Sequence, residues 1–375
     1  MDIDKDLTVA EPILILGDTD TVGMRLPGAS ATPSTLYGPR GVFYDGYTLV
    51  VADTGNHRVL LWFGLTDRDG APADLVLGQE NFYGDSPNAS KGAETGMYMP
   101  CGVLIHEGKL FVADSWNHRV LVWDGIPSSN NQPPDHVIGQ QSLRDNEAHT
   151  GESISPFGFF WCFGIGFVGE YFFVCDTGNR RVLGWKGIPA YGDTPDILLG
   201  QDDFHSYDEN RGGQVGINTF LWPHSISSNG EMTYIADAGN HRVIGFRGVP
   251  SDSAKPKVLL GQENFSSAVE NPYVPQSAHT LRFPYGVSVS DKTIAVADTS
   301  NNRVLMWEPV PEEGIYIPAR FVVGQEDFSS YGENRWQSVE RDTLCWCYDV
   351  HIYKNLLFVA DTGNNRVSVW RLLNP

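Results

Sequence analysis

The sequence is poor in cysteine, in basic residues and in long apolar runs. Its 375 residues include five unevenly spaced cysteines, unlike the disulfide framework of a small secreted protein. Lysine and arginine total 26 against 46 acidic residues, and the formal net charge of −20 disfavours contact with nucleic-acid phosphates. The N-terminal apolar run, Ile13–Leu16, is too short for a signal sequence or a transmembrane span. We therefore expect a cytoplasmic protein with neither a membrane nor a nucleic-acid partner.

Common catalytic motifs are also absent. The sequence has no glycine-rich phosphate loop, no nucleophile elbow and no His-Glu-X-X-His metal motif. It is rich in turn-forming residues, with 40 glycines and 23 prolines, and 41% of it is hydrophobic. This composition suits a fold with many turns around an ample core.

One stretch organises the chain, Val51-Ala-Asp-Thr-Gly-Asn-His-Arg-Val-Leu-Leu-Trp62, and it recurs five more times. The aspartates of the copies lie 61 to 63 residues apart, at Asp53, Asp114, Asp176, Asp237, Asp298 and Asp361. Such a fixed long period indicates a repeat architecture. In each copy a β-rich run enters a turn cluster and a second run leaves it, which predicts a β-hairpin whose glycine supplies a positive φ.

An arginine opens the second run of every copy, across the hairpin from the aspartate. These arginines are Arg58, Arg119, Arg181, Arg242, Arg303 and Arg366. A catalytic group would not be expected six times over. We interpret the pair as structural, either an ion pair or a clamp on loop carbonyl groups.

The repeated segment Val-Ala-Asp-Thr-Gly-Asn-His-Arg-Val resembles the NHL repeat, and its six copies cover nearly the whole chain. The resemblance implies an all-β fold, a six-bladed β-propeller of four-stranded antiparallel blades around a central channel. The unbroken repeat predicts a single domain over residues 1–375, and we expect a monomer. The blades should begin near residues 38, 99, 161, 222, 283 and 346.

A second repeated element predicts how the ring closes. An apolar run ending in Gly-Gln follows five of the hairpins and should be the outermost strand of each blade. The sixth hairpin has no such element after it, whereas Pro12–Gly17 matches the element in phase. We therefore predict that a strand at about residues 12–17 joins the C-terminal blade, which closes the ring and removes exposed sheet edges.

Two columns of the aligned repeats are candidates for function, because propeller ligands generally bind where the innermost strands begin. The first column is chemically varied and reads Arg40, Cys101, Phe163, His224, Tyr285 and Tyr348. Two residues earlier lies a largely aromatic collar, Gly38, Met99, Trp161, Trp222, Phe283 and Trp346. Strand alternation predicts that both columns face the channel mouth. The residues between them should point into the blades (Pro39, Pro100, Cys162, Pro223, Pro284 and Cys347).

Polar groups set in an aromatic wall are typical of a ligand pocket, or of a cage for a cation or planar ligand. We expect this mouth, with its long polar inter-blade loops, to bind a small molecule or a partner protein. The expected ligand-binding residues are Met99, Cys101, Trp161, Phe163, Trp222, Phe283, Trp346 and Asp349. The opposing interpretation is that the aromatics plug the channel and that Arg40 pairs with a nearby acid.

The segment Pro223-His-Ser-Ile226 resembles the Pro-His-Ser-Leu segment of peptidyl-amidoglycolate lyase propellers, which supplies a zinc-ligating histidine. The resemblance implies an alternative, a lyase or hydrolase at the same mouth, with His224 on the metal and Arg40 acting with Tyr285 or Tyr348. The chain departs from that family where further histidines should lie, since the column offers Cys101 and tyrosines. The implied metal site is then a single Zn or Cu on His224 and Cys101, with Asp349 nearby.

The other cysteines are expected to be structural or are left open. Cys175 replaces the alanine of the repeat and should be a small core residue. The Cys345-Trp-Cys347 segment suits a redox or metal role as well as a structural one.

Overall fold

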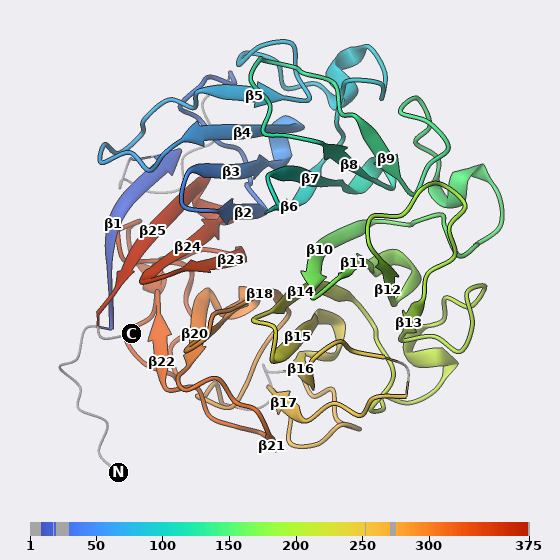
Figure 1. Cartoon of the computed structure of the whole chain (residues 1–375). Helices are drawn as coiled ribbons and strands as arrows, with labels where there is room; N and C mark the ends of the chain where they lie inside the picture. Colours follow the sequence, from blue (N-terminus) through green and yellow to red (C-terminus); the bar gives the residue numbers. More distant parts are fainter. Residues whose placement is uncertain (1–8, 18, 20–29, 252, 271–274, 374–375) are drawn as a thin grey trace.

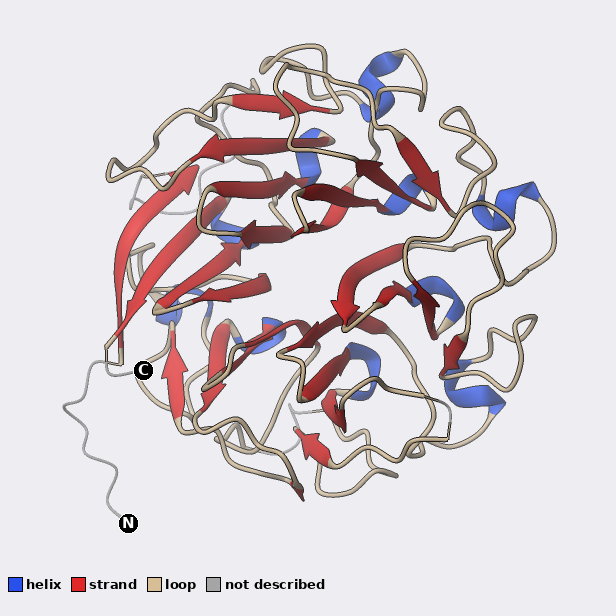
Figure 2. Ribbon diagram, in the orientation of Figure 1, coloured by secondary structure: helices blue, strands red, loops and turns tan. Residues whose placement is uncertain are grey.

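The computed structural model describes residues 9–17, 19, 30–251, 253–270 and 275–373. Its strands form six sheets that follow one another in chain order around a ring (Figure 1). The helical segments of the described residues are short 3-10 turns between strands (Figure 2), and none has the length and apolar character needed to cross a bilayer. The predicted six-bladed β-propeller is confirmed.

Each blade contains four antiparallel strands, which follow one another from the channel outward. Blade 1 has β2 (Gly41–Tyr44), β3 (Thr48–Asp53), β4 (Arg58–Phe63) and β5 (Leu75–Leu77). Blade 2 has β6 (Pro100–His106), β7 (Lys109–Asp114), β8 (Arg119–Trp123) and β9 (His136–Ile138). Blade 3 has β10 (Cys162–Val168), β11 (Tyr171–Asp176), β12 (Arg181–Lys186) and β13 (Ile197–Leu199).

The second half of the ring repeats this order. Blade 4 has β14 (Pro223–Ser228), β15 (Met232–Asp237), β16 (Arg242–Arg247) and β17 (Val258–Leu260), and β21 (Gly314–Ile315) adds a short parallel strand outside β17. Blade 5 has β18 (Pro284–Val289), β19 (Ile294–Asp298), β20 (Arg303–Trp307) and β22 (Phe321–Val323). Blade 6 has β23 (Cys347–Tyr353), β24 (Leu356–Asp361), β25 (Arg366–Leu372) and β1 (Ala10–Gly17).

The N-terminal strand β1 closes the ring as predicted, with two more residues than expected at its start. It pairs antiparallel with β25, so that Leu16 lies opposite Val367, and the two strands run side by side in Figure 1. Its outer edge is covered by a loop of blade 1, since the N–H of Ile15 donates to Asp69 at 2.9 Å. The Gly70 N–H in turn donates to the carbonyl of Ile15 at 2.9 Å. Both edges of this strand are therefore occupied.

Apolar side chains fill the spaces between neighbouring blades, which makes the core a ring of clusters. Val50 and Leu61 of blade 1, for example, pack with Val112 and Leu121 of blade 2. Each blade thus buries its faces only against its two neighbours, as expected for a closed repeat.

The hairpin turn has the predicted position and a different backbone. Thr54–Asn56 form a 3-10 turn, and the positive φ of 55° lies at His57. The role predicted for Gly55 is therefore wrong. This residue lacks a side chain because a Cβ atom would lie 2.6 Å from the ring of Tyr37. The residue after the 3-10 turn is left-handed in all six blades (His57, His118, Arg180, His241, Asn302 and Asn365).

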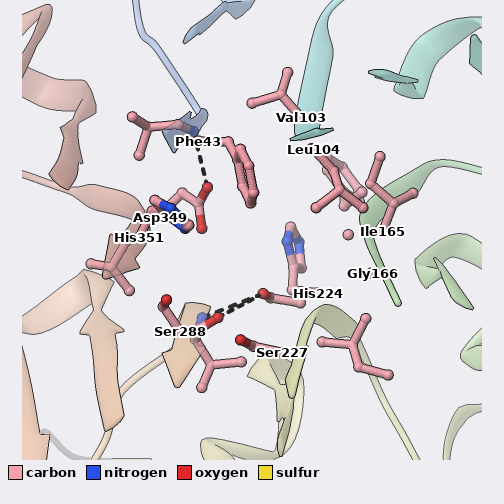
Figure 3. Close-up of a pocket in the computed structure, with 18 of the residues that line it drawn as sticks. Phe43, Val103, Leu104, Ile165, Gly166, His224, Ser227, Ser288, Asp349 and His351 are labelled. Atoms are coloured by element: carbon pink, nitrogen blue, oxygen red, sulfur yellow. Dashed lines mark hydrogen bonds between the residues drawn. The ribbon is translucent and has the colours of Figure 1, made fainter. Parts of the chain in front are cut away.

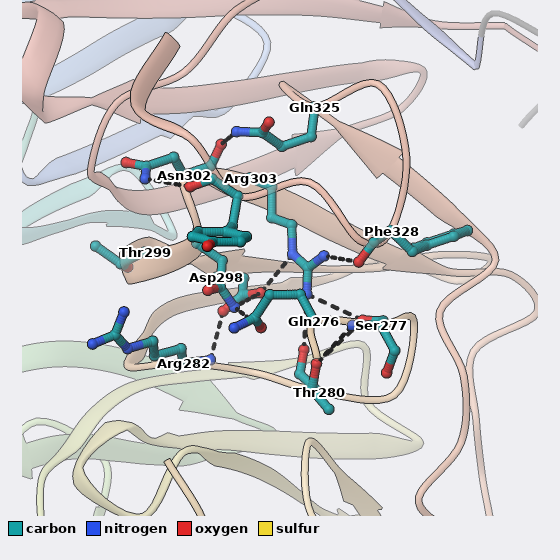
Figure 4. Close-up of polar contacts among 12 residues, drawn as sticks. Gln276, Ser277, Thr280, Arg282, Asp298, Thr299, Asn302, Arg303, Gln325 and Phe328 are labelled. Carbon is teal, nitrogen blue, oxygen red and sulfur yellow. Dashed lines mark hydrogen bonds and ion pairs between the residues drawn. The ribbon is translucent and has the colours of Figure 1, made fainter. Parts of the chain in front are cut away.

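The repeated Asp–Arg pair is both an ion pair and a clamp, as Figure 4 shows for blade 5. Arg303 Nε donates to Asp298 at 2.7 Å. The rest of the guanidinium donates to the carbonyls of Ser277 and Thr280 in the loop that enters the blade, each at 3.1 Å. It also donates to the carbonyl of Phe328 in the loop that leaves. The Nε–carboxylate distances of the six pairs are 2.7 to 2.9 Å. In every blade the guanidinium also donates to two carbonyl groups of the loop that enters the blade, which anchors that loop.

Candidate functional site at the channel mouth

The channel contains a cavity of about 220 Å³ that is lined by all six innermost strands. The first column of predicted residues lines it: Arg40, Cys101, Phe163, His224, Tyr285 and Tyr348. We call these six side chains the channel belt. The prediction that this column faces the channel is confirmed.

The rings of the channel belt stack on one another around the axis. His224 lies between Phe163 and Tyr285, with centroid distances of 4.3 Å on both sides. Tyr285 in turn lies 4.6 Å from Tyr348. The guanidinium of Arg40 lies 4.6 Å from the centroid of the Tyr348 ring, a cation–π contact. The belt is therefore a rigid, largely aromatic ring that carries one charge.

Arg40 is the positive charge of the belt, and no carboxylate of the described residues pairs with its guanidinium. Pairing with a nearby acid, the alternative considered from the sequence, is therefore wrong for the part of the chain that the structure describes. Burial and the charge of Arg40 lower the pKa of His224 to about 3. Burial raises the pKa of Tyr285 to about 12, and it also raises the pKa of Tyr348. At neutral pH the imidazole is neutral and both phenols keep their protons.

Beneath the belt, polar side chains bridge neighbouring innermost strands (Figure 3). Asp349 accepts a hydrogen bond from the Val42 N–H at 3.1 Å, and Ser288 accepts one from the Ile352 N–H at 2.9 Å. Burial raises the pKa of Asp349 to about 7. Asp349 lines the cavity, and one of its carboxylate oxygens is held by backbone.

Other cavity-lining residues on these strands were not predicted from the sequence. His351 bonds to the carbonyl of Tyr44 at 2.8 Å, and Ser227 accepts from the Val289 N–H at 3.1 Å. The aligned repeats could have indicated both residues. Each lies three positions after the belt residue of its blade, and each is polar.

The collar residues are not among the residues that line the cavity, so the two columns do not face it together as expected. Trp161, Trp222 and Trp346 are 38%, 37% and 42% exposed. Strand alternation does not extend to this column. Met99, Trp161, Phe283 and Trp346 have φ of 49 to 53°, Trp222 does not, and an irregular register follows the collar residue in blades 2 to 6.

A hydrogen bond from the preceding blade accompanies this left-handed backbone. The Met99 N–H donates to His57 at 3.1 Å, and the Trp346 N–H donates to Asn302 at 2.8 Å. His118 and His241 accept from the N–H groups of Trp161 and Phe283 in the same way. Trp222 follows a turn with Arg180, which has no side-chain acceptor, and is not left-handed. In the five turns that carry a histidine or asparagine, that side chain therefore holds the backbone of the collar residue of the next blade.

The residues between the two columns point into the blades, as predicted. Cys162 and Cys347 are fully buried, and their thiols donate to the carbonyls of Arg119 and Arg303 at 3.3 Å. Cys175 is also in the core, and burial raises the pKa of Cys345 as well. These thiols are packed as small core groups.

The belt offers few ligands for a metal. Among the described residues, no three His, Cys, Asp or Glu side chains come together in a way that could hold a metal ion. Phe163 stands between Cys101 and His224 in the ring order, and aromatic rings cover both faces of His224. The Cys101 thiol donates to the carbonyl of Met99 at 3.4 Å, and burial raises its pKa. A Zn or Cu on His224 and Cys101 stays a prediction that lacks a third protein ligand in the described part of the chain.

The comparisons with known proteins agree with the repeat and the ring. No family model matches the chain. A segment of 103 residues, 27% of this chain, is 32% identical to NHL repeat-containing protein 2 of Gallus gallus, and it spans 13% of that protein. The repeats, the six closed blades and this match support an NHL-type β-propeller.

A solved structure shares the fold of this chain. A structural genomics protein of unknown function from Bacteroides thetaiotaomicron matches 97% of this chain and 76% of its own, with a TM-score of 0.52 and 11% identity. A streptogramin B lyase structure matches 94% of this chain and 97% of its own, with a TM-score of 0.47 and 9% identity.

Proposed function

We propose that this NHL-type propeller is a binding module whose channel mouth holds a small ligand with an acidic group. The proposal rests on Arg40. Its guanidinium lies in the channel belt, and no carboxylate of the described residues pairs with it. In a chain with a net charge of −20, anions are repelled from most of the surface, so a lone cation marks a selective position. Guanidinium groups bind carboxylates through two parallel hydrogen bonds. The protonated phenols of Tyr285 and Tyr348 add donors beside it.

The collar supplies a surface for the apolar part of the ligand. Met99, Trp161, Phe283 and Trp346 keep large side chains at φ near 50°, where blade 1 has Gly38 at 54°. Left-handed backbone is free for glycine and costs a bulky residue on the order of 1 kcal/mol. Such strain, with exposed aromatic rings, indicates a role in binding. A partner protein that inserts an acidic side chain would use the same surface.

The enzyme alternative has less support from the geometry. His224 is neutral and stacked on both faces, and one oxygen of Asp349 is held by the N–H of Val42. Metal content of the purified protein and of His224→Ala, measured by elemental mass spectrometry, tests it directly. We expect no stoichiometric metal that depends on His224. Stoichiometric Zn or Cu that is lost in the variant would instead support a metal-dependent lyase or hydrolase.

The binding proposal is tested by calorimetric titration with benzoate and with benzamide, its neutral counterpart of similar shape. Benzoate should bind more tightly, and Arg40→Met should weaken benzoate by about tenfold or more with little effect on benzamide. Arg40→Lys, which keeps the charge but loses the fork of donors, should fall between the two. Arg144→Met, at an exposed surface ion pair, is the matched control. Equal binding of acid and amide, or benzoate binding that ignores Arg40, would remove the basis of the proposal.

A further inference from the structure

A second hollow, of about 300 Å³, lies in the loop that leaves blade 5 and shares no lining residue with the channel cavity. Two exposed aromatic side chains line it, Tyr331 at 46% and Trp336 at 74% exposure. Their rings meet edge to face, with centroids 6.2 Å apart and planes at 84°. The hollow therefore has two aromatic walls set nearly at right angles.

The backbone conformation at Trp336 is unfavourable for a large side chain. Asn334, Arg335 and Trp336 are three consecutive left-handed residues, with φ of 48°, 58° and 59°. The loops after blades 1, 2 and 3 contain the same left-handed triplet, and its third residue is Ser90, Gly151 and Gly212. Glycine adopts this conformation without cost, whereas tryptophan does so at the expense of stability. An exposed tryptophan in such a position points to a function in recognition.

A matching change at Gly332 fixes the position of the indole ring. Gly332 has a φ of −68°, so its backbone does not require glycine. A Cβ atom there would, however, lie 2.5 Å from the ring of Trp336. The equivalent residues of the other loops all carry side chains (Ser86, Glu147, Asp208 and Val269). Glycine at position 332 and tryptophan at position 336 both differ from the other loops, and the glycine leaves space for the indole ring.

A buried acceptor without a partner also lines this hollow. Gln325 is 5% exposed, and its Nε2 donates to the carbonyls of Asn302 and Gly332 at 2.9 and 2.8 Å. Its Oε1 atom has no hydrogen-bond partner among the described residues. In the preceding loop, the equivalent Gln262 Oε1 accepts from the hydroxyl of Ser267 at 2.9 Å.

In the loop after blade 5 the equivalent serine, Ser330, does not donate to Gln325 Oε1, because its hydroxyl donates to Asp327 at 2.9 Å. Gln140 and Gln201 also leave Oε1 unpartnered, but their loops have glycine in place of Trp336. A ligand that donates a hydrogen bond would satisfy Gln325 Oε1, since leaving a buried acceptor unpaired costs stability.

The charges of the hollow favour a cation. Arg335 is neutralised by Asp342 at 2.9 Å. Glu326 is exposed on the lining, and the described residues give its carboxylate no partner. We propose that this hollow binds an alkylammonium group. The cation lies against the rings of Tyr331 and Trp336, Glu326 supplies the counter-charge, and an N–H or neighbouring hydroxyl of the ligand donates to Gln325 Oε1.

Calorimetric titration with choline and with 3,3-dimethylbutan-1-ol tests this proposal, because the two molecules have the same shape and differ in charge. We expect choline to bind at least about tenfold more tightly than the alcohol. Equal binding of the two would overturn the cation assignment. Binding of glucose in preference to choline would overturn it as well, because it would make the hollow a sugar site.

Variants of the loop separate recognition from structure. Trp336→Gly restores the residue of the equivalent loops, so its Tm should be unchanged or higher while choline binding falls about tenfold or more. Glu326→Gln should weaken choline severalfold, and Glu263→Gln, at the same position of the preceding loop, should leave it unchanged. A lower Tm with unaltered choline binding in Trp336→Gly would show that the tryptophan is structural.

A trimethyl-lysine peptide distinguishes two sources of the same group. Tighter binding of the peptide than of choline would assign the ammonium to a protein partner, and the reverse to a small amine.

Discussion

Asp349 of blade 6 accepts a hydrogen bond from the backbone N–H of Val42 in blade 1 at 3.1 Å. Two residues later, His351 bonds to the carbonyl of Tyr44 in the same strand of blade 1 at 2.8 Å. The boundary between the first and last blades is therefore joined at the channel by side chains, whereas β1 and β25 join the chain ends at the rim by a backbone ladder.

Asp349→Asn should remove one pH dependence of stability. Burial raises the pKa of Asp349 from its usual 3.8 to about 7. Because the folded state then binds this proton more tightly than the unfolded state, the contribution is complete below about pH 4 and is lost as the pH rises through 7. We expect the variant to match wild type at low pH and to exceed its free energy of unfolding by roughly 1–3 kcal/mol at pH 8.

Urea unfolding of both proteins at pH 4, 6 and 8 measures this difference. Buried histidines with lowered pKa values, such as His351 at about 4, act in the opposite direction in the same range. Their effect cancels in the comparison of the two proteins. Parallel pH profiles would show that the carboxyl group does not titrate in this way.

Arg303→Met should destabilise the protein by about 3–5 kcal/mol, because it leaves the buried carboxylate of Asp298 without its cation and releases two loops. Chemical unfolding monitored by tryptophan fluorescence measures the loss. Arg144→Met, at the exposed pair with Glu94, should cost less than about 1 kcal/mol. Similar costs at the two positions would contradict the role of clamp.

Leu16→Ala should weaken the closing strand. Leu16 is 0% exposed and lies opposite Val367. Removal of its buried methyl groups should lower the free energy of unfolding by about 2–4 kcal/mol. Glu11→Ala, in the exposed part of β1 that pairs with Arg371, should have an effect below about 1 kcal/mol. A melting curve that does not distinguish the two variants would place the closure elsewhere.

Gly41→Ala should be far more costly than an alanine elsewhere on the surface. A Cβ atom at Gly41 would lie 1.9 Å from the carbonyl oxygen of Cys101 in the next blade. Relief of this overlap requires the two innermost strands to separate, at a cost of about 1–3 kcal/mol or more. Gly125→Ala, with nothing within 4 Å, should leave the Tm within a degree or two of wild type. An equal Tm for both variants would contradict the close approach of blades 1 and 2.

The repeat made most of the fold and part of the candidate site predictable from the sequence. Its period predicts the blades, the phase of Gly17 predicts the closing strand, and the aligned column from Arg40 to Tyr348 predicts the channel belt. These features depend on local pattern and on symmetry, which a sequence displays directly.

The orientation of the collar could not be predicted in the same way. Trp161 lies outside the channel lining, and its N–H donates to His118, a residue 43 positions earlier in another blade. The sequence shows His, Arg or Asn at that turn position without showing that only some of them accept a hydrogen bond from the next blade. The left-handed triplet that ends in Trp336 was likewise invisible, although glycine at 332 and tryptophan at 336 both depart from the aligned loops.

The arginine clamps hold their loops by carbonyl oxygens, and every amino acid carries one. Side chains along those loops can therefore be replaced during evolution without loss of the hydrogen bonds from arginine, provided that the backbone conformation is kept. If the hollow binds an alkylammonium group as proposed, the blade 5 loop, with its glycine and tryptophan, gained that specificity within an otherwise unchanged ring. The same property makes the loops suitable places for grafting designed recognition sequences.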